Sequence, residues 1–236
     1  NNMSLKLQEI IDLQTNVLII GGGGAGLKAA IAAREQGADV LLVSKSPPGY
    51  GNNTAIAGGA FATAGGWREP QDNPWVYQQD ALRSGRFINN ERLVHIMTSG
   101  SIQQVSDMER YGVSFTKTDG ALRVSQVPGH TYPRNIGCVE HIGAGLSVPM
   151  RKYALKLGVS FLEGVAITRL AKNGNTVTGG LGIDEGARFY NLRAKATVLA
   201  TGGLGQLYQQ TNNALEATGD GYALAYEVGL PLQDME

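Results

Sequence analysis

Cysteine is almost missing from this sequence of 236 residues, which contains only Cys138. A lone cysteine cannot form a disulfide within the chain, so an oxidised secreted scaffold is not expected and a cytoplasmic protein is favoured. An excess of one charge is also missing, because 20 lysines and arginines balance 20 aspartates and glutamates. A neutral chain without long charge runs gives no electrostatic reason to expect nucleic acid as a partner.

Long apolar runs are absent as well. No stretch approaches the roughly 20 apolar residues of a membrane-spanning helix, so no direct membrane insertion is expected. The length allows one large α/β domain or two small ones. We expect a leader with an N-terminal helix in residues 1–14, the helix spanning 4–13, and a single main domain in residues 15–236.

Glycine, with 33 residues, is about twice as frequent as in an average protein. Gly21, Gly23 and Gly26 match the pattern G-x-G-x-x-G. An apolar strand is predicted directly before them at 17–20, and a helix rich in Ala and Leu directly after them at 27–34. Glycines let the backbone turn sharply and approach a pyrophosphate, and the free N–H groups at a helix start attract its charge. This stretch therefore predicts a nucleotide-binding βαβ unit.

The second strand of this unit, predicted at 40–43, ends differently from that of a typical NAD protein. Ser44 and Lys45 follow it, where an acidic residue usually binds the adenosine ribose. Hydroxyl and ammonium groups can still hydrogen-bond a ribose or pair with a phosphate. The pattern favours a dinucleotide without the NAD signature.

Two further segments are rich in glycine. Residues 55–66 are almost all small, which would let a flat ligand lie against the main chain, although a flexible linker is the alternative. A buried strand predicted at 196–200 runs into a second glycine turn at 201–205, at the edge where open α/β sheets bind ligands. Residues 218–221 then open the last helix, with Asp220 as its expected N-cap.

Periodicity and turn residues place the remaining elements. The longest helix, predicted from Asn90 to near Gly112, should bury Leu93, Ile96, Met97, Ile102, Val105 and Met108. Other helices are predicted at 74–83 and 146–157, and strands at 113–115, 159–162, 165–170, 177–183 and 187–192. The last three strands should form a small antiparallel meander packed beside the parallel sheet, and Asp119 with Gly120 should form a turn.

The polar segment 128–145 holds His130, Cys138, Glu140 and His141, which are residue types that bind metals. Their spacings match no paired C-x-x-C or H-x-x-x-H arrangement. The sequence therefore favours a loop that lines a site over a metal centre.

Five blocks together resemble the FAD-binding domain of the flavoprotein family of succinate dehydrogenase, fumarate reductase and L-aspartate oxidase. They are Gly21 to Gly26, Ser44 with Lys45, Gly51 to Gly59 (GNNTAIAGG), Gly129 to Arg134 (GHTYPR), and Ala200 to Gly205 (ATGGLG) with Thr218 to Gly221 (TGDG). The resemblance extends over nearly the whole chain from Val17 onward. It implies an α/β class, a Rossmann-like three-layer fold with a parallel sheet and a small antiparallel β-meander, and an FAD-binding domain in residues 15–236.

The resemblance also implies which residues contact the cofactor. The first glycines would hold the FAD pyrophosphate, Ser44 and Lys45 would lie on the adenosine ribose side, and Asp220 near the ribityl chain. The complete set is Gly21, Gly23, Gly24, Ala25, Gly26, Ser44, Lys45, Asn53, Thr54, Ala57, Gly58, Gly59, Val165, Ala166, Thr201, Gly202 and Asp220. Members that bind FAD covalently have a histidine where alignment places Asn52, so the resemblance implies noncovalent FAD.

For the intact protein, the resemblance implies hydride transfer between FAD and a four-carbon dicarboxylate. Electrons would pass to a quinone through an iron-sulfur partner subunit, or to a soluble acceptor, and any membrane association would come from partner subunits. The family's substrate-binding arginines and histidine belong to a capping domain beyond Glu236, so this chain alone should hold no catalytic residue and be inactive. Whether His130 and Arg134 face the substrate site or order their own loop is open.

Other functions are compatible with the same residues. An L-aspartate oxidase-like flavoprotein would share the cofactor motifs, and a noncatalytic FAD-binding or subunit-docking module would need nothing more. A disulfide-reductase-type flavoprotein would need a second G-x-G-x-x-G and a redox C-x-x-x-x-C, and this sequence has neither.

Overall fold

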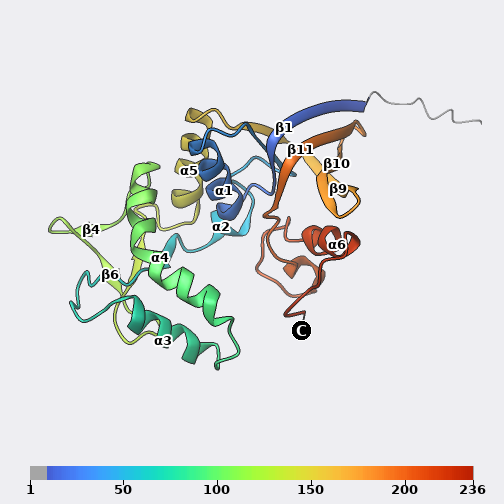
Figure 1. Cartoon of the computed structure of the whole chain (residues 1–236). Coiled ribbons are helices and arrows are strands. Elements are labelled where there is room, and N and C mark those ends of the chain that lie inside the picture. Colours follow the sequence, from blue (N-terminus) through green and yellow to red (C-terminus); the bar gives the residue numbers. More distant parts are fainter. Residues whose placement is uncertain (1–9, 236) are drawn as a thin grey trace, which may run out of the picture. The chain divides into compact units, whose positions relative to one another are not determined.

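Residues 10–235 are described by the computed structural model, and they form two compact units (Figure 1). The first, called the sheet unit, comprises residues 10–55 and 151–235. The second, called the helical unit, comprises residues 56–150. Helices α2 (Asn53–Ile56) and α5 (Ala144–Lys156) each run across one of the two boundaries.

A six-stranded sheet forms the centre of the sheet unit, with the order β8-β2-β1-β11-β10-β9. Its strands are β1 (Ile10–Ile20), β2 (Val40–Ser44), β8 (Ser160–Glu163), β9 (Val165–Asn173), β10 (Thr176–Asp184) and β11 (Phe189–Leu199). The first four strands in this order are parallel, whereas β10 is antiparallel to both β11 and β9. The carboxyl ends of β1, β2 and β11 therefore meet at one edge of the sheet.

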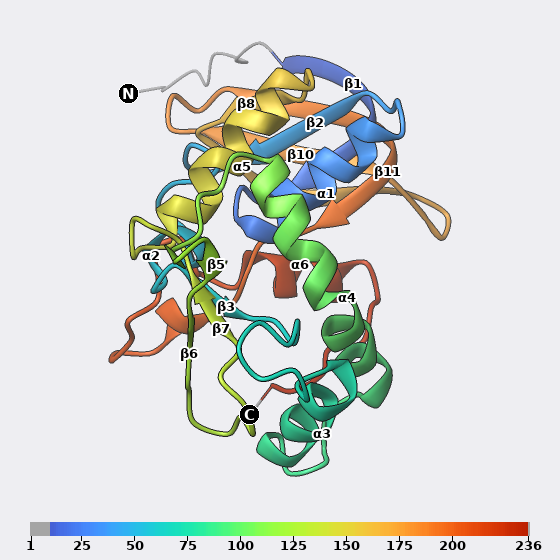
Figure 2. The same ribbon diagram turned by 90° about the vertical axis from the view of Figure 1, so that its left-hand side faces the viewer.

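Helix α1 (Gly24–Glu35) follows β1 directly and lies beside β2 in both views (Figure 2). Its buried residues are Gly26, Leu27, Ala30 and Ile31, which recur at helical spacing on one face. The expected strand, turn and helix are all present. The predicted βαβ unit is confirmed.

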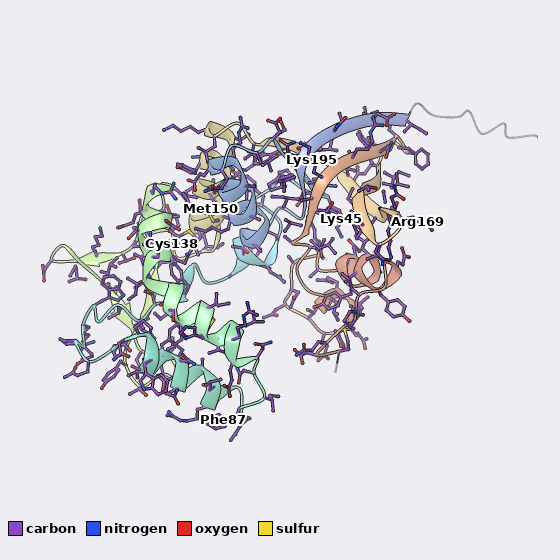
Figure 3. The ribbon with its side chains drawn as sticks, in the orientation of Figure 1. Lys45, Phe87, Cys138, Met150, Arg169 and Lys195 are labelled. Atoms are coloured by element: carbon purple, nitrogen blue, oxygen red, sulfur yellow. The ribbon has the colours of Figure 1, made fainter. Side chains whose placement is uncertain are left out.

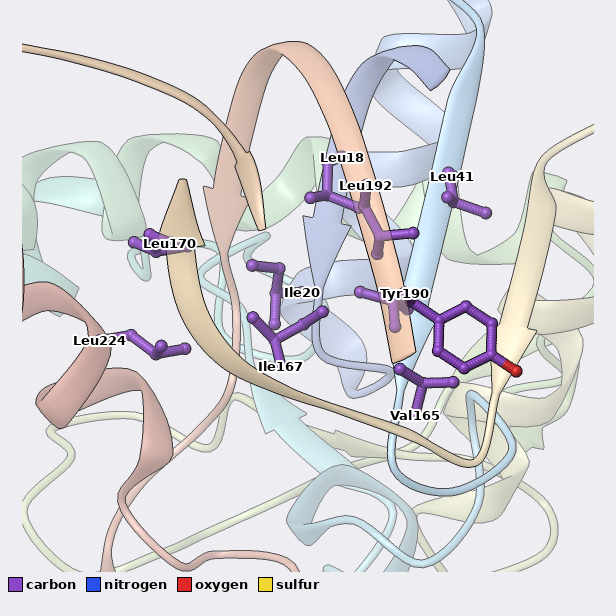
Figure 4. Packing of buried hydrophobic residues seen from close by; sticks show 10 residues of the cluster. Leu18, Ile20, Leu41, Val165, Ile167, Leu170, Tyr190, Leu192 and Leu224 are labelled. Atoms are coloured by element: carbon purple, nitrogen blue, oxygen red, sulfur yellow. The ribbon is translucent and has the colours of Figure 1, made fainter. Parts of the chain in front are cut away.

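Aliphatic side chains from β1, β2, β9 and β11 form the core of the sheet unit (Figure 4). Leu18 and Ile20 both belong to it because alternate residues of a strand share a face. Leu224, on helix α6 (Asp220–Glu227), packs into the same cluster. Burying one such side chain stabilises the fold by about 1.5–3 kcal/mol. The core therefore fixes both the strand ends and the start of α6.

Two predictions about the sheet are wrong. The helix expected at 4–13 is a strand over residues 10–13, because β1 pairs in parallel register with β11 from Ile10 onward; residues 4–9 lie outside the described residues. The segments 187–192 and 196–200 belong to one strand, β11, so the meander continues the parallel sheet and does not pack beside it. Since β10 pairs with β11 only as far as Arg193, the end of β11 is not fully covered and Val198 is 36% exposed.

The helical unit contains α3 (Pro74–Ser84) and α4 (Glu91–Arg110), which lie side by side in Figures 1 and 2. Its short strands are β3 (Ala60–Ala62), β4 (Lys117–Thr118), β5 (Ala121–Leu122), β6 (Val124–Ser125) and β7 (Asn135–Gly137). Both helices begin as predicted, α3 with Pro74 in its first turn and α4 with the Asn90 side chain accepting from the Leu93 N–H at 3.2 Å. The turn at 119–120 is confirmed by the hairpin of β4 and β5.

The buried face of α4 differs from the prediction. Val94, Thr98, Ser101 and Val105 are buried, whereas Leu93, Ile96, Met97 and Ile102 are exposed. Helical spacing allowed either face, and the contact with α3 and the core around Phe115 selects the more polar one. The strand expected at 113–115 is also wrong, since only Phe115 forms an isolated bridge, to Cys138. None of the helices within residues 10–235 is both long enough and apolar enough to cross a bilayer.

Candidate functional site

The glycine bend between β1 and α1 is packed so tightly that side chains are excluded. A Cβ atom on Gly21 would lie 2.2 Å from the carbonyl oxygen of Ala200, and Gly21 has a φ of +116°. A Cβ atom on Gly26 would lie 1.9 Å from the carbonyl oxygen of Gly21. Both obstacles are backbone atoms, which cannot move aside. The first and third glycines of the motif are therefore required by the close contact of the bend with helix α1 and with the end of β11.

A cavity of about 270 Å³ opens at this bend, at the carboxyl ends of the parallel strands. This is the edge at which open α/β sheets bind ligands. Residues from six separate segments of the sheet unit surround it. The predicted cofactor residues that line the cavity are Gly21, Gly23, Gly24, Ala25, Ser44, Lys45, Asn53, Thr54, Val165, Thr201, Gly202 and Asp220.

Five predicted residues do not line this cavity. Gly26 lies behind the bend, where its lack of a side chain serves packing. Ala166 lies on the opposite face of β9 from Val165, because successive strand residues alternate. Ala57, Gly58 and Gly59 belong to the helical unit, in which a Cβ on Gly59 would lie 2.7 Å from the sulfur of Cys138.

Several lining residues were missed by the sequence analysis. Gly22 and Asn52 lie between predicted positions and could have been included by continuity. The segment containing Ala214, Glu216 and Ala217 gave no signal, because it is irregular in sequence and reaches the cavity only through tertiary contacts.

Asn53 and Thr54 hold the rim of the cavity together. The Asn53 side chain accepts from the backbone N–H of Ala214 at 2.7 Å and donates to Asn213 at 2.8 Å. The Thr54 hydroxyl accepts from the backbone N–H of Gly24 at 3.0 Å. These bonds tie α2 to the start of α1 and to the distant segment 213–217.

Lys45 lies at the carboxyl end of the sheet, where Figure 3 labels it, and it is bonded to the start of α6. Its ammonium group donates to a carboxylate oxygen of Asp220 at 2.7 Å and to the Thr218 hydroxyl at 2.7 Å. Burial raises the pKa of Asp220, but the hydrogen bonds from Lys45 and Thr218 outweigh it and bring that pKa below the ordinary value. The N-cap of α6 is Gly219, at φ +81°, so the expectation that Asp220 caps the helix is wrong.

The cavity has the features that a dinucleotide phosphate needs. Gly23, the N-cap residue of α1, makes no side-chain hydrogen bond, and the first turn of α1 contains no acidic residue. The positive end of the helix dipole therefore has no competing negative side chain. Space remains beside the glycines of the second turn, since a Cβ on Gly202 or Gly203 would meet no atom within 4 Å. The residues present fit an extended anionic dinucleotide.

His130 and Arg134 belong to a buried network in the helical unit. Arg134 is fully buried, and its guanidinium donates to Asp72 at 2.6 and 3.1 Å and to Asp80 at 2.7 Å. The Arg134 guanidinium also lies 4.9 Å from the centre of the Tyr77 ring. Its donors are engaged within the protein, so Arg134 orders its loop. No group of metal-ligating side chains is found within residues 10–235.

The comparison with protein families identifies one match. The model of the FAD binding domain matches residues 16–236. This range covers all of the cavity residues of the sheet unit.

Curated relatives resemble the chain along almost its whole length. One protein of the fumarate reductase (CoM/CoB) of Methanothermobacter marburgensis is 33% identical over 94% of this chain and 41% of its own length. The succinate dehydrogenase flavoprotein of Rickettsia bellii is 30% identical over 98% of this chain and 40% of its own length. The chain thus spans about 40% of the length of these relatives.

Solved structures give the same result. Sdh1 of Mycobacterium smegmatis superposes with a TM-score of 0.87 at 31% identity, over 93% of this chain and 39% of that one. The quinol fumarate reductase of E. coli superposes with a TM-score of 0.90 at 26% identity, over 96% of this chain and 39% of that one. The α/β fold and the expected resemblance are confirmed.

Proposed function

This chain belongs to the FAD binding domain family, and from this premise we propose that it is the cofactor-binding part of a flavoprotein of the succinate dehydrogenase and fumarate reductase type. The carrying observation is the cavity at the glycine bend, which combines an uncapped helix start with glycines that exclude side chains. FAD, when bound, supplies the hydride chemistry. The chain's own residues bind and orient it.

Each part of the cavity has a proposed role. The backbone at Gly23, Gly24 and Ala25 holds the pyrophosphate at the start of α1. Lys45 and Asp220 give the adenosine and ribityl sides their polar partners, while Val165 offers an apolar surface to a ring. Of the seventeen residues predicted to contact FAD, the twelve that line the cavity have this support.

A single substitution tests the pyrophosphate site. Gly23 has the backbone geometry of an ordinary N-cap, with φ −77°, and the nearest atom to an added Cβ is 3.7 Å away. Gly23→Asp should therefore be tolerated, and an aspartate at an N-cap favours its helix. Its charge would repel the pyrophosphate, so FAD affinity should fall. Gly23→Asn is the matched control, because it caps the helix without the charge.

FAD titration of both variants, followed by flavin fluorescence, measures the effect. The proposal predicts that Gly23→Asp binds FAD much more weakly than Gly23→Asn, while both unfold at or above the wild-type temperature. Equal FAD affinities in two folded variants would contradict a pyrophosphate at this helix start.

We also propose that FAD is bound noncovalently. Asn52, which occupies the position of the covalent histidine in some family members, lines the cavity and donates to the backbone carbonyl of Gly22 at 3.3 Å. An amide cannot form the covalent bond. Acid denaturation of the FAD-loaded protein should release all flavin into the supernatant, and flavin retained by the precipitated polypeptide would refute this.

In a protein of the relatives' length, the proposed reaction is hydride transfer between FAD and a four-carbon dicarboxylate. Steady-state turnover of the full-length protein with succinate, fumarate and aspartate separates this from an L-aspartate oxidase. Co-purification with an iron-sulfur protein in a membrane fraction would support assembly through partner subunits. Absence of turnover with all three substrates, with FAD bound, would instead favour a noncatalytic FAD-binding module.

A further inference from the structure

The helical unit contains an open groove between the end of α3 and the loop 129–131. It encloses about 480 Å³ and is lined by Arg83, Ser84, Arg86, Gly129, His130 and Thr131. We propose that this groove binds a small oxyanion, with inorganic phosphate and a carboxylate as the two sources of that chemistry. The proposal does not depend on the flavin reaction.

The lining of the groove is rich in hydrogen-bond donors. Two guanidinium groups and the Ser84 hydroxyl line it, and none of its six lining residues in the described chain is acidic. The loop is pressed against α3 at one point, since a Cβ on Gly129 would lie 2.7 Å from the Ser84 hydroxyl oxygen. A planar guanidinium matches the oxygens of phosphate and carboxylate, which makes this lining suited to an oxyanion.

Arg86 is held in a conformation that bulky residues rarely adopt. Its φ is +54°, and that of the next residue, Phe87, is +62°. Hydrogen bonds from the backbone N–H of Arg86 to Arg83, at 3.1 Å, and from that of Phe87 to Leu82, at 2.9 Å, hold the turn. Phe87 itself is 68% exposed (Figure 3). Packing of a side chain therefore does not explain the strained turn, whereas placing a guanidinium at the groove does.

The charge of Arg86 is not compensated within the described chain. Neither an ion pair nor a side-chain hydrogen bond joins Arg86 to any of residues 10–235. Arg83 is 66% exposed and lies 3.3 Å from Asp80. Asp80 is already bonded to Arg134 at 2.7 Å and to the Thr131 hydroxyl at 2.6 Å, so its charge is shared. The groove keeps a net positive character.

His130 adds a neutral donor to the same lining. Nη1 of Arg134 lies 3.4 Å from Nδ1 of His130, and a guanidinium can only donate. Nδ1 is therefore the accepting nitrogen, and Nε2 carries the proton. Burial and the nearby Arg134 charge both lower the pKa of His130, against the opposing effect of Asp80 and Asp72, so the ring stays neutral at pH 7.

Calorimetric titration of the FAD-loaded full-length protein tests the proposal. FAD loading keeps the probe out of the cofactor site. Inorganic phosphate and succinate are titrated separately at constant ionic strength, and saturable binding of either supports the site and identifies its source. Arg86→Asn should weaken that binding about tenfold or more, because a hydrogen bond to a charged group is lost.

Arg86→Asn also separates binding from folding. Asparagine tolerates positive φ better than arginine, so the variant should be at least as heat-stable as the wild type. Arg123→Asn removes an equal charge from an exposed position outside the groove and should leave binding unchanged. Arg86→Lys, which keeps the charge but not the planar fork, should show an intermediate loss. The proposal fails if neither anion binds saturably, or if Arg86→Asn and Arg123→Asn weaken binding equally.

Discussion

Arg134→Met should strongly destabilise the helical unit, because it removes the only charge partner of a buried carboxylate. Arg134 is fully buried, and the carboxylates of Asp72 and Asp80 are each 2% exposed. Within residues 10–235, both hydrogen bonds to the Asp72 carboxylate come from Arg134, whereas Asp80 keeps its bonds from Thr131. Removing one partner of a buried ion pair costs about 3–5 kcal/mol. The expected loss is therefore a large share of the roughly 5–15 kcal/mol that holds a typical domain folded.

Urea unfolding at pH 7, followed by circular dichroism at a fixed FAD concentration, measures this loss. Adding Asp72→Asn to Arg134→Met should restore part of the stability, since the orphaned charge is then gone. Arg123→Met, at an exposed site, serves as the control and should change the free energy of unfolding by less than about 0.5 kcal/mol. A loss below about 1 kcal/mol for Arg134→Met, similar to the control, would refute the reasoning about the buried pair.

The same pair predicts a pH dependence. Burial raises the pKa of Asp80, but bonds from Thr131 and Arg134 outweigh it, so the pKa lies below its ordinary value of 3.8. The ionised form therefore stabilises the fold above that value, and this contribution is lost as the pH falls through the lower folded pKa. The stability difference between wild type and Arg134→Met should shrink below about pH 4. A difference that stays constant or grows in acid would contradict this account.

Three further changes test other parts of the structure. Gly26→Ala should abolish FAD retention on gel filtration or prevent folding, because its Cβ would lie 1.9 Å from the Gly21 carbonyl oxygen; a variant that keeps its flavin would refute the packing argument. Lys45→Met should lower stability by no more than about 1 kcal/mol in urea unfolding, since the Lys45–Asp220 pair is partly exposed, and the small loss should vanish in acid as Asp220 protonates below its ordinary pKa of 3.8. Gly100→Ala should raise the free energy of unfolding by about 0.5–1 kcal/mol, because Gly100 lies within α4 with no atom within 4 Å of an added Cβ; destabilisation would show that this surface is covered in solution.

Local signals predicted most of the elements that frame the cavity. The strand, turn and helix around Gly21 to Gly26 follow from an apolar run, glycines without room for a side chain, and an Ala-rich helix. The caps of α3 and α4 follow from hydrogen bonds within a few residues, which any chain with these side chains forms. Such short-range effects do not depend on the rest of the fold.

Long-range choices were not readable in the same way. Helical spacing on α4 was compatible with a face built on Leu93 and Met97, and packing against α3 selected Val94 and Thr98 instead. Residues 10–13 look helical by periodicity, yet their pairing with β11 makes them a strand, since a register with a distant strand outweighs local propensity. Whether Arg134 orders its loop was undecided until its two buried carboxylates were located.

The sequence by itself determined that a dinucleotide cavity begins at the first glycine bend, because close backbone contacts there tolerate only glycine. Only the tertiary structure decided what completes that cavity: the segment 213–217, the joining of Lys45 to α6, and the single strand β11 that links the meander to the parallel sheet. These contacts join residues up to 175 positions apart, and no pattern along the chain encodes which distant partner a polar side chain will meet.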